Sequence, residues 1–463
     1  MSVVTTVGRG VVWSTTAAIL GKFIMLANVF LTLHFLTVYE YGFTELVMSI
    51  ISMIGIVLLP GLTTAIVADM AVEKGRNNAA GMKLVFHQFF FLNLALGFAA
   101  WAVLFFGSHP VAQAFGNPYA AQFLQIASFM FLISPIRSAT TILATVMLRF
   151  FDQSFYGIFE ELAKLGFLLL FVVWLKMGIH GLIYSMVLCQ LVIVIAFLPR
   201  TASAYKQFAG ATAEGHMHFW NVLRDHRIWG IGNAYMSTVT QNVRLWLIKF
   251  MLGTEAVGLF GFASGLFSHI VSLMPLTSVL APIIPRYIDK RDQLARIIRA
   301  SIKVQLGLAL VFLIGAYATS YVFVLVLFPK YLSAVPLLYI LLLTIIPNSV
   351  TTLFTPVFNA FKEQRSLLFS NTLKLLCILV LLPPSILIFG LNGVGVEIFL
   401  NVVINGFERY RRIRLLIPEF RFGTREMLHT DAYEKEAFSA VAKSFSERLP
   451  GPLRRIVEQH TRA

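Results

Sequence analysis

Charged side chains are scarce in this 463-residue sequence. Asp, Glu, Lys and Arg together make up 13% of the residues, while hydrophobic residues make up 58%. Soluble domains contain about a quarter charged residues, because a polar surface must cover the core. The low charge excludes a soluble globular protein of this length and predicts an integral membrane protein.

Cysteine is also scarce, and the motifs of common enzymes are missing. Cys189 and Cys377 each lie inside an apolar run, which excludes a disulfide framework and indicates two small hydrophobic residues. There is no phosphate-binding P-loop and no Asp-x-Asp motif for a metal-bound nucleotide sugar. Two histidines in Gly215-His-Met-His218 are weak evidence for a metal site. We therefore predict no enzyme activity, no cofactor and no metal.

Long apolar runs are abundant instead. A transmembrane helix needs about 20 mostly apolar residues. The runs that approach or exceed this length are Val11–Leu36, Phe43–Ala68, Leu84–Gly107, Ala120–Met147, Phe155–Leu175, Gly181–Leu198, Ile228–Leu252, Val257–Ile284, Ser301–Phe328, Val335–Phe361, Leu367–Phe389 and Gly393–Phe407. The first is too long for the apolar region of a cleaved signal peptide, so we expect an uncleaved span. The sequence thus predicts an all-α polytopic membrane protein with about twelve transmembrane helices.

Basic residues are distributed very unevenly between the loops. The loops after the odd-numbered runs hold only Lys176 and Lys330, whereas the other loops and both termini hold 28 of the 37 Lys and Arg residues. Cytoplasmic loops carry the excess of positive charge in membrane proteins. Both termini and the loop at 199–227 are therefore predicted to be cytoplasmic. This topology explains the formal net charge of +15 without a nucleic-acid partner.

The chain repeats itself at a nearly constant offset. Gly178-Ile-His-Gly181 is matched 212 residues later by Gly390-Leu-Asn-Gly393, and Glu40-Tyr-Gly42 is matched by Glu255-Ala-Val-Gly258. These matches predict two related halves of six helices. Because six is even, both halves enter the membrane from the same side, as in a parallel repeat. Transporters often bind substrate in a central cavity where such halves meet.

The repeat and the polar stretches suggest four parts of the chain. They are an N-terminal half at 1–198, a cytoplasmic loop at 199–227, a C-terminal half at 228–417 and a basic cytoplasmic tail at 418–463. In the tail, Phe438, Val441, Ala442 and Phe445 share one helical face. This pattern fits either a helix on the membrane surface or a short solvated tail.

Several cations lie inside the predicted spans, where each costs about 2.5–3.5 kcal/mol to insert. Arg244 shares one face of the run Ile228–Leu252 with the polar residues Asn233 and Gln241. Such faces predict a water-filled cavity lined with positive charge, which suits a phosphate or pyrophosphate because Arg binds it bidentately. The predicted substrate-binding residues are Lys22, Arg137, Lys164, Arg244, Lys374, Asn233 and Gln241.

The acidic residues within spans have two interpretations. Glu397 lies deepest, and Glu160 and Glu161 precede Lys164 by about one helical turn. A buried carboxyl group can bind a coupling proton, which makes all three candidates for ion coupling. Alternatively, Glu160 and Glu161 simply neutralise Lys164.

Loose motifs connect the chain with a known family. They are Gly8-Arg-Gly-Val-Val-Trp13, Tyr41-Gly42, Pro60-Gly61-Leu62 and the basic loop before Leu84–Gly107. With these motifs and its two halves, nearly the whole chain except the tail resembles the Wzx-type polysaccharide flippases. That family belongs to the multidrug/oligosaccharidyl-lipid/polysaccharide exporter superfamily.

The resemblance implies transport of undecaprenyl-pyrophosphate-linked oligosaccharide units across the bacterial inner membrane, for a surface polysaccharide such as lipopolysaccharide or exopolysaccharide. The implied partners are this lipid-linked oligosaccharide, membrane lipid, a polysaccharide polymerase and other assembly proteins. It also implies a cavity that opens alternately to each side, with Lys22, Arg137 and Arg244 as cavity cations.

Two alternatives remain open. A multidrug antiporter of the same superfamily needs a buried carboxylate for its cationic substrates, and Lys22 and Arg244 have the opposite sign. A membrane polymerase or transferase is disfavoured because the loops predicted to face outward are short and nearly uncharged. For alternating access, we predict hinges at prolines that interrupt helices. They are Pro60, Pro135, Pro275, Pro347 and Pro356.

Overall fold

A computed structural model describes residues 20–59, 62–114, 116–211, 227–274, 280 and 284–423. Throughout these residues the secondary structure is helical, without strands, which confirms the predicted all-α fold. The chain divides into two compact units. The described residues of Met1–Ala263, Val322–Val335 and Ile378–Val394 form the first unit, and those of Ser264–Tyr321, Pro336–Cys377 and Gly395–Ala463 form the second.

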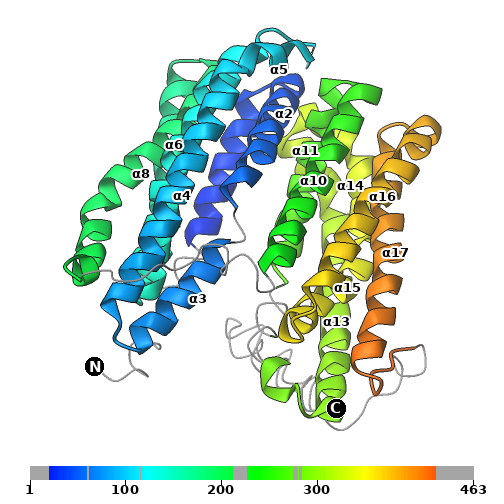
Figure 1. Ribbon diagram of the computed structural model, residues 1–463. Coiled ribbons are helices and arrows are strands. Elements are labelled where there is room, and N and C mark those ends of the chain that lie inside the picture. Colours follow the sequence, from blue (N-terminus) through cyan, green and yellow to red (C-terminus); the bar gives the residue numbers. More distant parts are fainter. Residues whose placement is uncertain are drawn as a thin grey trace, which may run out of the picture. The chain divides into compact units, whose positions relative to one another are not determined.

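Helices occupy most of the described residues of the predicted runs, but the run Phe43–Ala68 is divided between helical segments that end at Leu58 and begin at Leu62 (Figure 1). Up to residue 211 they are Leu20–Phe35, α2 (Val38–Gly55), η1 (Ile56–Leu58), α3 (Leu62–Gly75), α4 (Ala79–Phe106), α5 (Ser108–Ala114), α6 (Ala120–Val146), α7 (Phe150–Leu168), the π-helical η2 (Leu169–Trp174) and α8 (Gly178–Ala209). From residue 227 they are α10 (Arg227–Leu252), α11 (Thr254–Ser272), η3 (Ile284–Tyr287), α13 (Arg291–Leu327), η4 (Pro329–Ala334), α14 (Val335–Leu343), α15 (Ile345–Ala360), α16 (Gln364–Phe389) and α17 (Asn392–Leu416).

Seven of the described helices are long and apolar enough to cross a membrane, and the bent pair of η4–α14 and α15 raises the number to eight. The protein is therefore a multi-pass membrane protein. Helices also occupy the predicted spans Phe155–Leu175, Ile228–Leu252 and Gly393–Phe407, but α7, α10 and α17 there are more polar. The count of twelve crossings stays a prediction. The polar helices are also those that carry most of the candidate site residues.

Local sequence explains where several helices begin. Thr37 and Glu40 form a capping box at the start of α2, in which the backbone N–H of each donates to the side chain of the other.

The repeated glycine motif has a structural role in both halves. Gly178 and Gly390 both adopt left-handed backbone conformations, with φ of 55° and 58°, just before or at the start of a long helix. Glycine adopts this conformation without the strain that a Cβ atom would add.

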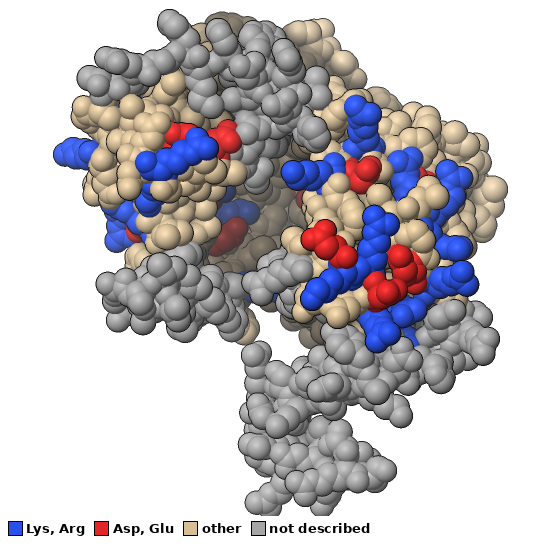
Figure 2. Space-filling view, turned by 60° about the horizontal axis from the view of Figure 1, so that its bottom comes forward, with Lys and Arg blue, Asp and Glu red and all other residues tan. Residues whose placement is uncertain are grey.

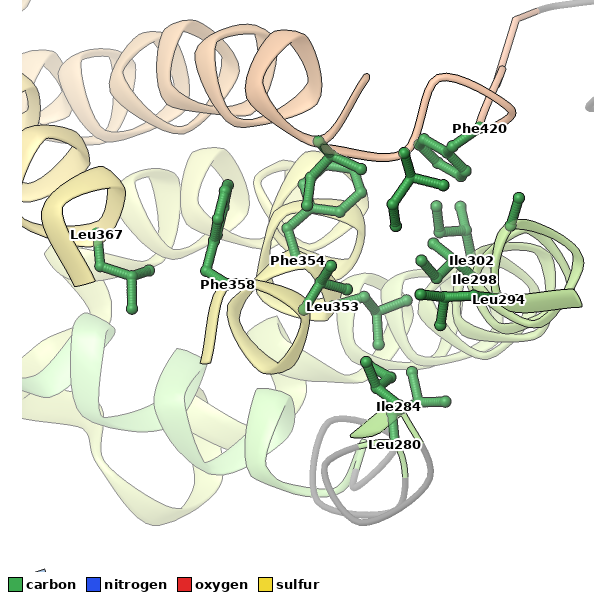
Figure 3. Close-up of a cluster of buried hydrophobic side chains, with 14 of the residues drawn as sticks. Leu280, Ile284, Leu294, Ile298, Ile302, Leu353, Phe354, Phe358, Leu367 and Phe420 are labelled. Carbon is green, nitrogen blue, oxygen red and sulfur yellow. The ribbon is translucent and has the colours of Figure 1, made fainter. Parts of the chain in front are cut away.

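Each unit has its own apolar core. In the first, α6 packs against α4 and α8, and a cluster that includes Met70, Phe86, Ile142 and Phe208 joins α3, α4, α6 and α8. In the second, Figure 3 shows side chains of α13 and α15 meeting Phe420, which follows α17. The predicted domain limits at 198, 227 and 417 stay predictions; α8 continues past residue 198 to Ala209, and residues 212–226 and 424–463 lie outside the described part.

Two of the predicted hinge prolines, Pro60 and Pro275, also lie outside the described residues. Pro135 and Pro356 lie inside α6 and α15. Pro347 lies in the first turn of α15, next to the 51° bend that separates α14 from α15. A proline inside a helix lacks the N–H that would bond four residues back, so Pro135 and Pro356 interrupt the backbone ladder, whereas the first-turn position of Pro347 has no such bond to lose.

Candidate functional site

An ion pair joins two of the residues selected from the sequence. Nη2 of Arg137 on α6 lies 2.8 Å from Oε2 of Glu160 on α7. The Arg137 side chain is 43% exposed and that of Glu160 is 15% exposed. Arg137 was predicted to bind substrate and Glu160 to couple an ion. The structure brings them together, so neither role can be considered without the other.

Glu161, the next residue, is held by the first described helix. Nδ2 of Asn28 donates to Oε2 of Glu161 at 2.6 Å and to its backbone oxygen at 3.0 Å. Asn28 is almost completely buried, and its backbone oxygen accepts a hydrogen bond from Thr32. Sequence reasoning did not select Asn28, although an amide in the middle of an apolar run was a signal for it.

Lys164 and Glu45 complete this group. Lys164 lies one turn after Glu160 on α7 and interacts electrostatically with Glu160 and with Glu45 of α2. Tyr41 forms a side-chain hydrogen bond with Glu45. We call the set of Asn28, Glu45, Arg137, Glu160, Glu161 and Lys164 the polar cluster. It has three carboxylates and two cations, so its charge is mixed.

The remaining predicted residues of the first unit lie on two other helices. Lys22 is exposed on the helix Leu20–Phe35. On α10, Gln241 is exposed, and Asn233 and Arg244 are half-buried. A different face of α10 contacts α2. Nε1 of Trp246 donates to Oγ of Ser49 at 3.1 Å, and Nδ2 of Asn242 lies 3.4 Å from Oγ of Ser52. The face that carries Gln241 is therefore turned away from this packing contact.

The second unit contains a separate buried network along α17. Nδ2 of Asn401 donates to Oε1 of Glu397 at 2.7 Å and to the backbone oxygen of Lys374 at 3.0 Å. One turn further, Nδ2 of Asn405 donates to Oδ1 of Asn401 at 2.9 Å. Glu397 is fully buried. Both predicted residues of this unit, Lys374 and Glu397, thus belong to one network, Lys374 through its backbone.

Arg409 ends this network. Its Nε donates to Oγ of Ser370 at 2.8 Å, and its Nη1 donates to the backbone oxygen of Thr351 and to Oγ1 of Thr355. Its guanidinium is buried, and these three hydrogen bonds go to uncharged acceptors on α15 and α16. We call Glu397, Asn401, Asn405 and Arg409 the polar ladder. Their four-residue spacing on one helix was visible in the sequence, but only Glu397 was selected.

Known proteins place the chain in a family. Residues 34–336 match the family described as "Polysaccharide biosynthesis protein". The chain belongs to this family. No curated protein matches this family member at a significant level.

Solved structures show which fold the family member has. It is similar to an inward-facing multidrug resistance MATE family transporter of the MOP superfamily, with a TM-score of 0.70, 13% identity and coverage of 86% of this chain and 95% of that one. The lipid II flippase MurJ in an inward closed conformation has a TM-score of 0.69 at 12% identity, covering 97% and 96%. The Vibrio cholerae MATE transporter VcmN in the bent form has a TM-score of 0.59 at 15% identity, covering 90% and 100%. The predicted similarity to this superfamily is thereby confirmed at the level of the fold.

The chemistry open to this family member follows from its charged groups. Among the described residues, no three His, Cys, Asp or Glu side chains are grouped to hold a metal ion. The histidines of Gly215-His-Met-His218 lie outside the described part. The polar cluster combines two cations, the side chains that bind anions in proteins, with three carboxylates, which are the groups that bind protons.

Proposed function

We propose that the protein is a flippase for polyprenyl-pyrophosphate-linked oligosaccharides, with undecaprenyl as the lipid, in the bacterial inner membrane. Membership of a polysaccharide biosynthesis family supports a polysaccharide intermediate as the cargo. The fold, which a lipid II flippase and drug transporters also have, supports transport rather than catalysis. The observation that carries the proposal is the ion pair of Arg137 with Glu160, in which the arginine side chain is 43% exposed.

Arg137 can recognise the pyrophosphate that links sugar and lipid. A guanidinium has five N–H donors in a planar fork, and Glu160 contacts only Nη2 at hydrogen-bond distance. The other donors would bind phosphate oxygens. Lys164, one turn beyond Glu160, would add a second positive charge for the doubly charged linker.

Glu160 competes with the cargo for Arg137. Both are anions, so the binding of pyrophosphate to Arg137 is strongest when Glu160 releases the guanidinium. Protonation of Glu160 would remove its charge and allow this release. Because of this competition, cargo binding to Arg137 would be coupled to protonation of Glu160. Glu160 would therefore be the residue that couples the proton to transport. Asn28 holds Glu161 nearby, and Glu397 in the polar ladder is the corresponding candidate in the second unit.

The transport cycle would be alternating access. The charged headgroup would enter a cationic cavity from the cytoplasm while the polyprenyl chain stays in lipid, because burying a long hydrocarbon in a polar cavity is unfavourable. Lys22, Arg244, Asn233 and Gln241 would line the path of the headgroup. Motion at Pro135, Pro347 and Pro356 would then open the cavity to the outside. A polysaccharide polymerase and other assembly proteins would receive the cargo.

The experiment is complementation of a strain that lacks the gene. The variants Arg137→Gln, Arg244→Glu and Lys22→Glu are expressed at equal level, and cell-surface polysaccharide is measured. We expect each to lower it severalfold. Lys206→Gln, which removes an exposed cation from the end of α8, is the control and should leave it unchanged. Normal polysaccharide in all three variants would refute the cationic site.

A cation exporter is the second candidate, because the polar cluster has more carboxylates than cations. It predicts that Glu45→Gln abolishes resistance to cationic drugs. The flippase predicts no change in drug resistance on deletion of the gene, together with loss of surface polysaccharide. Measuring both quantities in one deletion strain separates the two functions.

A further inference from the structure

A recurring arrangement of arginine on phenylalanine lies outside the polar cluster and the polar ladder. Arg200 lies near the end of α8, the last helix of the N-terminal half. Its guanidinium carbon is 5.2 Å from the ring centre of Phe151 and 5.4 Å from that of Phe197. Arg412 lies near the end of α17, the last helix of the C-terminal half, and its guanidinium carbon is 4.3 Å from the ring centre of Phe369.

The two arginines occupy the same position of the internal repeat. Arg412 follows Arg200 by 212 residues, the offset that relates the glycine motifs at Gly178 and Gly390. Each arginine has a ring partner on the preceding helix, Phe151 on α7 or Phe369 on α16, although these two rings are 218 residues apart rather than 212. The acidic partners do not recur in this way. Arg200 pairs with Asp152 on α7, whereas Arg412 pairs with Glu408 on α17 itself. The feature common to both halves is therefore the stacked arginine and not a particular ion pair.

Each stacked arginine keeps donors for a further ligand. Among the described residues, Arg200 donates side-chain hydrogen bonds only through Nη1, to Asp152 at 2.6 Å. Arg412 donates through Nε to Glu408 and through Nη1 to Ser366 at 2.9 Å. In both residues the hydrogen bonds given above leave the N–H groups of Nη2 as possible donors to a ligand. The cation–π contact holds the guanidinium against the ring, which restricts where these groups can point.

The surroundings are typical of a headgroup site at a membrane surface. Phe151, which Arg200 contacts, is an exposed apolar side chain, and Leu148 and Leu198 on the same two-helix region are exposed as well. Phe369, which Arg412 contacts, is also exposed, as are Phe407 and Leu415 on α17. Figure 2 looks onto the helix ends at the bottom of Figure 1 and shows Lys and Arg side chains, with some Asp and Glu, at these helix ends of each unit. In a membrane, an arginine between exposed apolar side chains and basic helix ends would lie near the lipid phosphates.

We propose that Arg200 and Arg412 each bind the phosphate of an anionic phospholipid, one lipid at the basic helix ends of each unit. The acyl chains would lie along the exposed apolar side chains of α7 and α8, or of α16 and α17. Nη2 would donate to the phosphate oxygens while the ring holds the guanidinium. This inference does not depend on the proposed cargo.

The test measures lipid binding by the full-length protein. Purified protein in mild detergent is titrated with phosphatidylglycerol, and bound lipid is counted by native mass spectrometry. We expect two bound lipids, and a loss of affinity of about fivefold at each site on substitution. The variants are Arg200→Gln with Arg412→Gln, and the milder Arg200→Lys with Arg412→Lys, which keeps the charge but loses the planar fork. The matched control is Lys206→Gln with Arg411→Gln, which removes exposed cations from the same two helices.

The outcomes separate the sources of the phosphate. Phosphatidylcholine and diacylglycerol should bind more weakly than phosphatidylglycerol, and the control variant should bind as the unchanged protein does. An equal loss in the control would show that net charge alone attracts the lipid and would overturn the proposal. Displacement of phosphatidylglycerol by geranyl pyrophosphate at equal concentration would assign the sites to the pyrophosphate-linked cargo and would also overturn it.

Discussion

Gly42 on α2 and Gly258 on α11 pack so closely that neither position has room for a side chain. A Cβ atom on Gly42 would lie 2.2 Å from the backbone oxygen of Thr254, and one on Gly258 would lie 2.1 Å from that of Val38. These glycines are equivalent in the internal repeat. Small residues allow transmembrane helices to approach closely, so equivalent helices of the two halves touch here at equivalent points within the first unit.

Gly42→Ala and Gly258→Ala should each destabilise the protein. The added methyl group meets backbone atoms that cannot move aside, which costs about 1–3 kcal/mol. Gly265→Ala on α11 is the control, because nothing lies within 4 Å of its added Cβ. Thermal unfolding in detergent should show lower midpoints for the first two variants and an unchanged or higher one for the control. Equal midpoints in all three would contradict the close contact.

Gly97→Ala on α4 should also lower stability. The proline at 135 leaves the backbone oxygen of Phe131 without its helical partner, and a Cβ on Gly97 would lie 2.6 Å from that oxygen. The substitution would separate α4 from α6. Gly157→Ala on α7, where the added atom has nothing within 4 Å, is the comparison. We expect the midpoint of thermal unfolding to fall for Gly97→Ala alone, and a fall of the same size at Gly157 would refute the packing argument.

The exchanged pair Arg137→Glu with Glu160→Arg distinguishes a structural from a functional ion pair. Each single change should destabilise the protein by about 1 kcal/mol, because the arginine is partly exposed. The double variant should recover expression and melting temperature but not surface polysaccharide, since the cation has moved from α6 to α7. Full recovery of the polysaccharide would mean that the pair serves only to hold the helices together.

Arg409→Met should lower stability by about 2 kcal/mol, because the substitution leaves buried acceptors on Ser370 and Thr351 without their donor. Arg409→Lys should recover only part of this loss, since an ammonium group cannot reach all these acceptors in the geometry of the planar fork. Arg411→Met, two residues on and exposed, should have little effect. If the melting temperatures of Arg409→Met and Arg411→Met agree, the polar ladder contributes nothing to stability.

The predicted topology can be tested with an impermeant thiol reagent on whole cells. Both native cysteines are buried, so the background labelling should be low. Lys176→Cys and Lys330→Cys, at exposed turns, should be labelled from outside. Lys290→Cys and Lys362→Cys, which are equally exposed, should be labelled only after the cells are opened. The opposite pattern would place both termini outside the cytoplasm.

The helices were predictable because the cause of each is local. Apolar runs of about 20 residues form helices in a membrane, since only a helix satisfies its own backbone within one segment. The turns at Gly178 and Gly390 were visible for the same reason, because a left-handed residue favours glycine at that one position. Only part of the polar ladder could be predicted. Its four-residue spacing is present in the sequence, but Arg409 lies beyond the predicted end of its span, so it was assigned to the loop cations.

The amino-acid sequence by itself determined the all-helical membrane fold, the internal repeat and the excess of charge in one set of loops, because these depend on composition and local order. Only the tertiary structure decided that Glu160 pairs with Arg137, that Asn28 holds Glu161 across 133 residues of chain, and that Gly42 meets Gly258. Each of these contacts joins different helices. Spacing along one helix shows which side chains share a face, but not which helix that face will meet.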